Sequence, residues 1–215
     1  MYKKLSCLLF VLCWYVSPIL AKIKPHVQAK KVLAHIKTPN SFQADFIYTR
    51  QEKDEEDSQQ IQGKVWTKGN KYKIVLDEQI IISNGETIWN YLPELHEVHI
   101  NNFEAEEAAA LFSPTQLMHI HQQGFIPIAL KLITIDKIDY DIIELVASDQ
   151  EKFINQLSLT IGRKSHQIKT MKALDNNGTL HSFMIINLVP DIDVEDNYFE
   201  FDVTKYNNLD IVDLR

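Results

Sequence analysis

The sequence predicts a mainly β protein with a few helices, an α+β fold built on antiparallel strands. Three observations predict this class. About a dozen short stretches carry the alternation or the β-branched enrichment of strands. The dipeptides Asn84-Gly85 and Asn177-Gly178 suit tight hairpin turns. Only two stretches have helical periodicity, so helices form a minor part of the fold.

The first 21 residues have the pattern of a secretory signal peptide. Two lysines precede an apolar run, and Ala21 is the expected cleavage residue. Ser17 and Pro18 interrupt the run before it reaches the roughly 20 apolar residues that span a membrane. We therefore expect a soluble, exported protein with a signal peptide over residues 1–21 and a single domain over residues 22–215.

The cysteine content and the net charge argue against a disulfide-stabilised fold and against some classes of binding partner. Cys7 and Cys13 both lie in the signal region, so the mature chain cannot depend on disulfides. Loss of Lys3 and Lys4 changes the formal net charge from −7 to −9. Such a balance argues against nucleic acid or an anionic membrane surface as the main partner.

The two expected helices are amphipathic. In "VQAKKVLAHIKTP", Val32, Leu33 and Ile36 recur at helical spacing. In "SPTQLMHIHQQG", Ser113 can cap the first turn and Gly124 can end the helix.

The strands follow from alternation and from turn residues between them. They are expected at 42–50, 61–68, 72–76, 79–83, 87–91, 97–100, 126–134, 140–146, 157–163, 167–174 and 180–188, with a last one at "YFEFDV" (198–203).

Some of these strands are apolar on one face and others on both. Tyr72, Ile74 and Leu76 share one face, whereas residues 80–82 are three consecutive isoleucines. A large curved sheet with an apolar concave face needs a cover, and the two amphipathic helices could supply it.

Metal and catalytic sites have weak support. His96 and His99, and likewise His119 and His121, lack the spacing that brings ligands together on one face. No Gly-x-Ser-x-Gly turn is present, and the acidic clusters "DEED" and "PDIDVED" read as solvated loops. We expect a protein that is not an enzyme and that needs no cofactor or metal.

Aromatic and aliphatic residues remain as candidates for a site. A packed core could account for the aromatic residues on the strands, which are Trp66, Tyr72, Trp89 and Tyr91. It could also account for the apolar residues of the second helix. By periodicity alone they could equally line a cavity.

Several stretches taken in order resemble the periplasmic outer-membrane lipoprotein carrier family, LolA. They are "GKVWTKGNKYKIVL", "IISNGETIWNYLPELHEVHI", "SPTQLM" and "FEFDVTKYNNLDIVDLR". The resemblance implies an incomplete, half-open antiparallel β-barrel, covered by a helical lid that encloses an apolar cavity for acyl chains. The residues it implies for this lipid-binding cavity are Leu33, Ile36, Trp66, Tyr72, Ile74, Leu76, Trp89, Tyr91, Leu117, Met118 and Ile120.

The chain departs from the family at one position. Better-known members carry an arginine on the strand before the buried aromatic, where it latches the lid. The matching stretch "WTKGNKYKI" has lysines and glycine, so Lys68 is the candidate substitute, without the planar donor fork of arginine.

The resemblance implies a periplasmic carrier of lipoproteins to the outer membrane. The implied partners are acylated lipoproteins, an inner-membrane ABC-type release complex, and an outer-membrane receptor or the membrane itself. We expect a monomer that does not bind nucleic acid. Two alternatives remain: the same fold carrying another lipid or glycolipid, or a secreted β-sandwich that binds carbohydrate or acts as a hydrolase.

Overall fold

The structure is a computed structural model that describes residues 25–215 except 56, 104–112 and 150. The expected signal peptide lies outside the described residues. Twelve strands form one sheet in the order β12-β6-β5-β4-β3-β2-β1-β11-β10-β9-β8-β7. Neighbouring strands pair antiparallel except β12, which pairs parallel with β6.

The strands alternate with few helical segments. The strands are β1 (Ser41–Gln51), β2 (Gln59–Lys68), β3 (Lys71–Leu76), β4 (Ile80–Ser83), β5 (Thr87–Leu92), β6 (Glu97–Asn102), β7 (Phe125–Ile135), β8 (Ile138–Ala147), β9 (Ile154–Gly162), β10 (Ile168–Asp175), β11 (Leu180–Pro190) and β12 (Asp210–Asp213). Among the described residues, the α-helices are α1 (Pro25–Ala34) and α3 (Pro114–His119), and the 3-10 turns are η1 (Pro93–Leu95), η2 (Ile120–Gln122), η3 (Asp196–Phe199) and η4 (Val203–Lys205). None of the helices in the described part of the chain is both long and apolar enough to cross a membrane.

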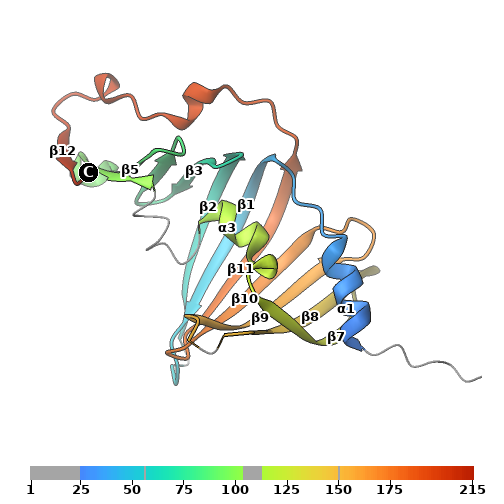
Figure 1. Cartoon of the computed structure of the whole chain (residues 1–215). Coiled ribbons are helices and arrows are strands. Elements are labelled where there is room, and N and C mark those ends of the chain that lie inside the picture. Colours follow the sequence, from blue (N-terminus) through green and yellow to red (C-terminus); the bar gives the residue numbers. More distant parts are fainter. Residues whose placement is uncertain (1–24, 56, 104–112, 150) are drawn as a thin grey trace, which may run out of the picture.

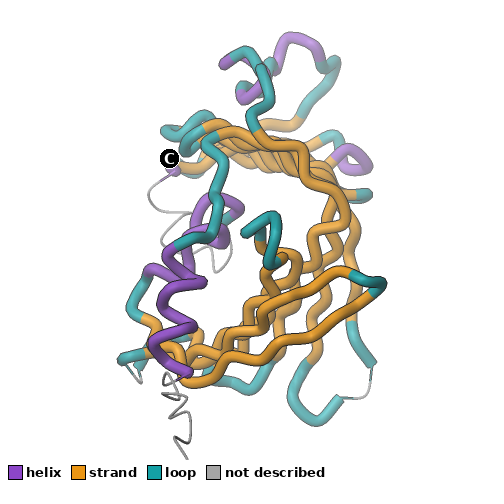
Figure 2. Tube along the Cα trace, turned by 90° about the vertical axis from the view of Figure 1, so that its right-hand side faces the viewer, coloured by secondary structure: helices purple, strands orange, loops and turns teal. Residues whose placement is uncertain are grey.

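The sheet is open and strongly curved. Figure 2 shows it bending into a C, with helices along the open side. The predicted class, mainly β with a few helices, is confirmed, and the sheet does not close into a barrel.

Helix α3 begins where the sequence predicts, whereas α1 ends at Ala34, so Ile36, which was expected in the helix, lies beyond it. Ser113 caps α3, because its Oγ accepts a hydrogen bond from Gln116 N–H at 3.1 Å, and Pro114 occupies the first turn. In α1, Ala29 is fully buried among apolar residues of β8 and β9 such as Ile143 and Leu159. Helix α1 therefore covers the part of the concave face nearest β7 (Figure 1).

The hairpin between β4 and β5 forms as predicted, although Asn84 acts differently from a simple two-residue turn. Its Oδ1 accepts hydrogen bonds from Glu86 N–H at 2.9 Å and Thr87 N–H at 2.8 Å. Gly85 supplies the positive φ of 89°. Strand pairing follows, with Ile82 opposite Trp89.

The expected last strand at residues 198–203 is wrong. These residues lie in a C-terminal segment, residues 191–209, which holds two 3-10 turns and crosses the outer surface of the sheet before β12 (Figure 1). Phe199 and Phe201 are buried against that surface rather than alternating in a ladder. The apolar residues of "YFEFDV" therefore pack onto the sheet from outside. Their spacing resembles that of a strand although they do not form one.

Candidate functional site

An apolar pocket lies between α3 and the concave face of the sheet. Its volume is about 100 Å³. The residues that line it come from five strands and α3, and all are apolar: Phe42, Ala44, Phe46, Val65, Ile74, Pro114, Leu117, Met118, Ile168, Met171, Phe183 and Ile185.

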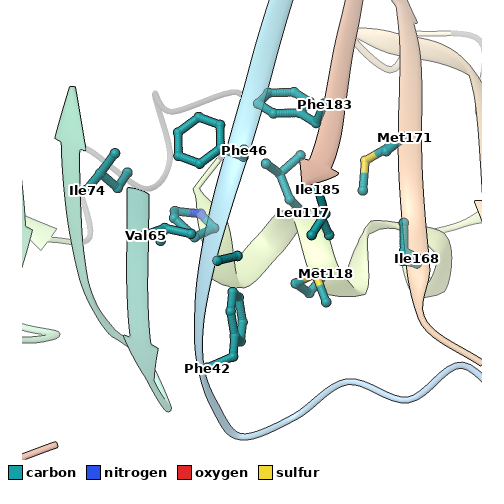
Figure 3. A pocket seen from close by; sticks show the side chains of 12 residues that line it. Phe42, Phe46, Val65, Ile74, Leu117, Met118, Ile168, Met171, Phe183 and Ile185 are labelled. Carbon is teal, nitrogen blue, oxygen red and sulfur yellow. The ribbon is translucent and has the colours of Figure 1, made fainter. Parts of the chain in front are cut away.

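Strand alternation explains how these side chains converge. On β1, Phe42, Ala44 and Phe46 are two residues apart and so share one face. Figure 3 shows Leu117 and Met118 of α3 directed toward the side chains of the sheet. The pocket therefore has a wall of strands on one side and a six-residue helix on the other.

A glycine keeps room beside this wall. Gly63 pairs with Phe46 on β1 and Leu76 on β3. A Cβ at Gly63 would lie 2.5 Å from Leu76 Cδ2 and 2.8 Å from Phe46 Cζ. Without a Cβ at residue 63, both side chains can lie close against β2.

Three of the eleven predicted site residues line the pocket. Ile74 comes from β3, and Leu117 and Met118 come from α3. Tyr72 and Leu76 lie on the same face of β3 as Ile74, to either side of it along the strand. The assignment of β3 and α3 residues to opposite walls thus agrees with the geometry, and their role in lipid binding stays a prediction.

Three further predicted residues lie on the concave side without lining this pocket, in a cluster that shares Ile168 and Met171 with its wall. Ile120 is buried in the cluster beneath α1, and Leu33 and Ile36 pack against the same cluster. Leu33 thus joins α1 to β8, β9 and β10, while Ile36 and Ile120 contribute from just beyond α1 and from η2.

The remaining three, Trp66, Trp89 and Tyr91, lie on the other face of the sheet. Trp66 follows the pocket residue Val65 on β2, and its indole contacts the Tyr198 ring edge-on with 5.8 Å between centroids. Tyr91 packs against Phe201 and Tyr206, with ring centroids 5.3 and 4.8 Å apart. These three aromatic residues therefore pack on the side of the sheet that the C-terminal segment covers, and they do not line the pocket.

We call this second apolar region the outer cluster. Its members are Ile82, Tyr91, Val98 and Phe201, with Ile80, Trp89, Tyr206 and Leu209 packed against them. Its existence explains the three consecutive isoleucines of β4. Ile80 and Ile82 face the outer cluster, and Ile81 faces the concave side, so both faces of the strand are apolar.

Lys68 contacts the C-terminal segment. Its Nζ donates to Val194 O at 2.8 Å and to Asp196 Oδ1 at 2.8 Å, and Lys71 Nζ contacts Asp196 Oδ2 at 2.9 Å. Hydrogen bonds from Lys68 and Lys71 lower the pKa of Asp196 to about 2. Among the described residues, these contacts tie the C-terminal segment to β2 and β3, so they do not join Lys68 to α3.

His121 lies directly after α3 and is buried with an unpartnered ring nitrogen. Its side chain is 8% exposed, and Nδ1 has no hydrogen-bond partner among the described residues. Burial, and secondarily the charge of His119, lowers the pKa of His121 to about 4. The imidazole is therefore neutral at neutral pH.

Because of His121, we expect the folded state to lose stability in acid. The unfolded chain binds the His121 proton with a pKa near 6.5 and the folded chain with a pKa of about 4. Unfolding thus takes up a proton between these values, so stability falls as pH drops from about 6.5 to 4, by at most about 3 kcal/mol. In urea titrations, His121→Phe should lack this part of the pH dependence, whereas the exposed control His96→Asn should keep it. Equal pH profiles for His121→Phe and wild type would contradict the assignment.

Most of the pocket residues escaped prediction from sequence. Phe42, Ala44 and Phe46 could have been found from their alternation on β1, and Val65 from its place beside Trp66. The large aromatic residues Trp89 and Tyr91 on a hairpin give a stronger sequence signal than these smaller residues do. The choice of which face is the inner one needs the curvature of the sheet, and alternation alone does not give it.

Comparison with known proteins gives a family match. The family described as "Outer membrane lipoprotein carrier protein LolA" matches residues 37–202. No curated protein sequence is similar enough to the chain to count as a match.

Several solved structures are similar to this chain. An uncharacterized conserved protein from Thermus thermophilus has a TM-score of 0.53 at 9% identity, over 86% of this chain and 99% of that one. A LolA superfamily protein from Nitrosomonas europaea has a TM-score of 0.42 at 14% identity, over 80% and 97%. The lipoprotein LppX from Mycobacterium tuberculosis has a TM-score of 0.40 at 13% identity, over 81% and 97%.

Proposed function

Because the chain belongs to the LolA family of outer membrane lipoprotein carrier proteins, we propose that it binds the acyl chains of lipoproteins in the pocket beneath α3 and carries them through the periplasm. The wholly apolar lining of that pocket is the observation that supports this proposal. A lining without hydrogen-bonding side chains suits hydrocarbon and offers little to a sugar or a charged metabolite.

The energetics explain why such a carrier is needed. Each buried methylene contributes about 0.8 kcal/mol, so a chain of about 15 methylenes resists transfer to water by roughly 12 kcal/mol. A lipoprotein with two or three such chains cannot cross an aqueous compartment unaided. A protein that shields the chains removes this barrier.

Loading requires that α3 act as a movable lid. A cavity of about 100 Å³ is smaller than the roughly 300–1,000 Å³ of ordinary ligand pockets. Helix α3 has six residues, too few for stability on its own, so its position depends on packing. Leu117 and Met118 fill the space that an acyl chain would take, and Met118 has the flexible side chain suited to repacking.

The rest of the cycle is proposed on the same basis. An inner-membrane ABC-type complex would supply the lipoprotein, and an outer-membrane receptor or the membrane itself would accept it. The signal peptide expected at residues 1–21 would direct export, and cleavage near Ala21 would leave a free monomeric carrier.

Identification of the native cargo tests the proposal. Protein purified from the periplasm without detergent should carry acylated peptide that organic extraction releases, visible by mass spectrometry as about one lipoprotein per loaded molecule. Recovery of a free lipid or glycolipid would favour the alternative cargo. Protein without any acyl-containing molecule, from cells whose lipoprotein export is blocked after the carrier step, would contradict the proposal.

A further inference from the structure

A chain of buried polar groups lies on the concave face next to the apolar pocket. Tyr48 Oη is 2.9 Å from His181 Nδ1, and His181 Nε2 is 3.4 Å from Asp175 Oδ2. His181 and Asp175 are each 4% exposed. Buried ionisable groups in an otherwise apolar interior cost stability and so point to a function.

The position of Tyr48 connects this network to the pocket. Its ring stacks on Phe183, a pocket residue, with centroids 4.7 Å apart. Tyr48 also lies two residues beyond Phe46 on β1, on the same face of the strand. Tyr48 is not itself a lining residue of the pocket, but it packs on one, and its half-buried phenol remains reachable.

The proton positions follow from Asp175. Burial raises the pKa of this carboxyl, but hydrogen bonds from Thr179 N–H, His181 and Asn177 N–H outweigh that effect and lower it. Asp175 is therefore ionised and accepts a hydrogen bond from Nε2–H of His181. In the tautomer that donates from Nε2, Nδ1 is the ring's acceptor, so the Tyr48 hydroxyl donates to it.

The network thus ends in an acceptor. Tyr48 Oη uses its only hydrogen toward His181 and makes no other hydrogen bond with the described residues. Donation to the imidazole makes the oxygen a better acceptor, because hydrogen bonds in a chain strengthen one another.

Turn formation alone does not account for this arrangement. Asp175 does hold the β10–β11 turn, since its Oδ1 accepts from Asn177 N–H at 2.9 Å and Thr179 N–H at 2.8 Å. These contacts need neither His181 nor Tyr48. The two rings extend the network away from the turn toward the pocket.

We propose that Tyr48, held by His181 and Asp175, forms a polar subsite that accepts a hydrogen bond from an N–H or O–H group at the head of an acyl chain in the pocket. This subsite rests on the proposed function, since it requires that the pocket bind acyl chains. It would favour chains attached through an amide over chains attached through an ester, because the amide keeps an N–H donor. His181 is a positioning residue that orients the phenol.

A matched pair of probes isolates the hydrogen bond. N-hexadecylacetamide and hexadecyl acetate differ only in the replacement of N–H by an ester oxygen, and hexadecanol tests the hydroxyl donor. Their affinities are measured by displacement of N-phenyl-1-naphthylamine from the full mature protein. Wild type should bind the amide about three- to tenfold more tightly than the ester.

Variants assign that preference to the phenol. Tyr48→Phe should abolish the preference and leave the affinity for the ester within about twofold, whereas the control Tyr140→Phe on β8 should keep it. His181→Leu should also lose the preference, and His181→Asn, whose amide oxygen can accept from Tyr48, should retain it. A purely structural role would weaken all probes alike.

The possible results distinguish failure of the Tyr48 subsite from failure of acyl-chain binding in the pocket. Equal binding of amide and ester by wild type, or an unchanged preference in Tyr48→Phe, would overturn the subsite alone. Failure of all three probes to displace the dye from wild type would overturn acyl-chain binding, and the subsite with it.

Discussion

Ile74→Glu is expected to leave the protein folded and to abolish uptake of acylated cargo. Ile74 lines the pocket and is only half-buried, so a carboxylate at this position can reach water and remain charged. Acyl chains would then meet a charged wall instead of an apolar one, at a cost of several kcal/mol. The expected loss of lipoprotein release from inner-membrane vesicles is tenfold or more, about 1.4 kcal/mol per tenfold step.

Two further variants sharpen this test. Leu117→Glu places the charge on the opposite wall, on α3, and should have the same effect. Val75→Glu is the matched control, because Val75 is the next residue on β3, is also half-buried, and faces the outer side. It should release cargo normally. If Ile74→Glu melts far below wild type, or carries cargo as well as Val75→Glu does, residue 74 does not line a ligand site.

Tyr91→Ala is expected to destabilise the fold by about 3–5 kcal/mol and to leave acyl-chain affinity unchanged. Tyr91 is buried in the outer cluster and contacts Phe201 and Tyr206, on the face opposite the pocket. Its removal should loosen the C-terminal segment from the sheet. Urea titration gives the stability, and dye displacement at low temperature gives the affinity of the folded protein.

A matched variant controls for the loss of a tyrosine as such. Tyr140 on β8 is half-buried and lies outside the outer cluster, so Tyr140→Ala should cost much less stability. A Tyr91→Ala protein with normal stability and weakened acyl-chain binding would show that Tyr91 lines the ligand site after all.

The sequence was sufficient for the strands from β1 to β11 and for both described α-helices. Hairpin turns at Asn84 and Asn177, the cap at Ser113 and local alternation are signals that a few neighbouring residues carry. Strand β12 was missed because its residues, 210–213, pair parallel with β6, which is distant in sequence. Such pairing leaves no local turn signal.

The site was harder to predict than the strands. Alternation assigns Tyr72, Ile74 and Leu76 to one face, and the structure places that face on the concave side. Trp89 and Tyr91 alternate equally well, but their face is covered by the C-terminal segment. Only the path of that segment decides which apolar face is enclosed by α3 and which by residues 191–209.

We propose that acyl chains occupy the space between α3 and the concave face. A photo-reactive side chain at Leu117, and in a separate variant at Trp89, tests it during release of a lipoprotein with radiolabelled acyl chains. If acyl chains occupy this space, the label should crosslink to the Leu117 variant and not to the Trp89 variant. Crosslinking at Trp89 alone, or at neither position while release proceeds, would contradict it.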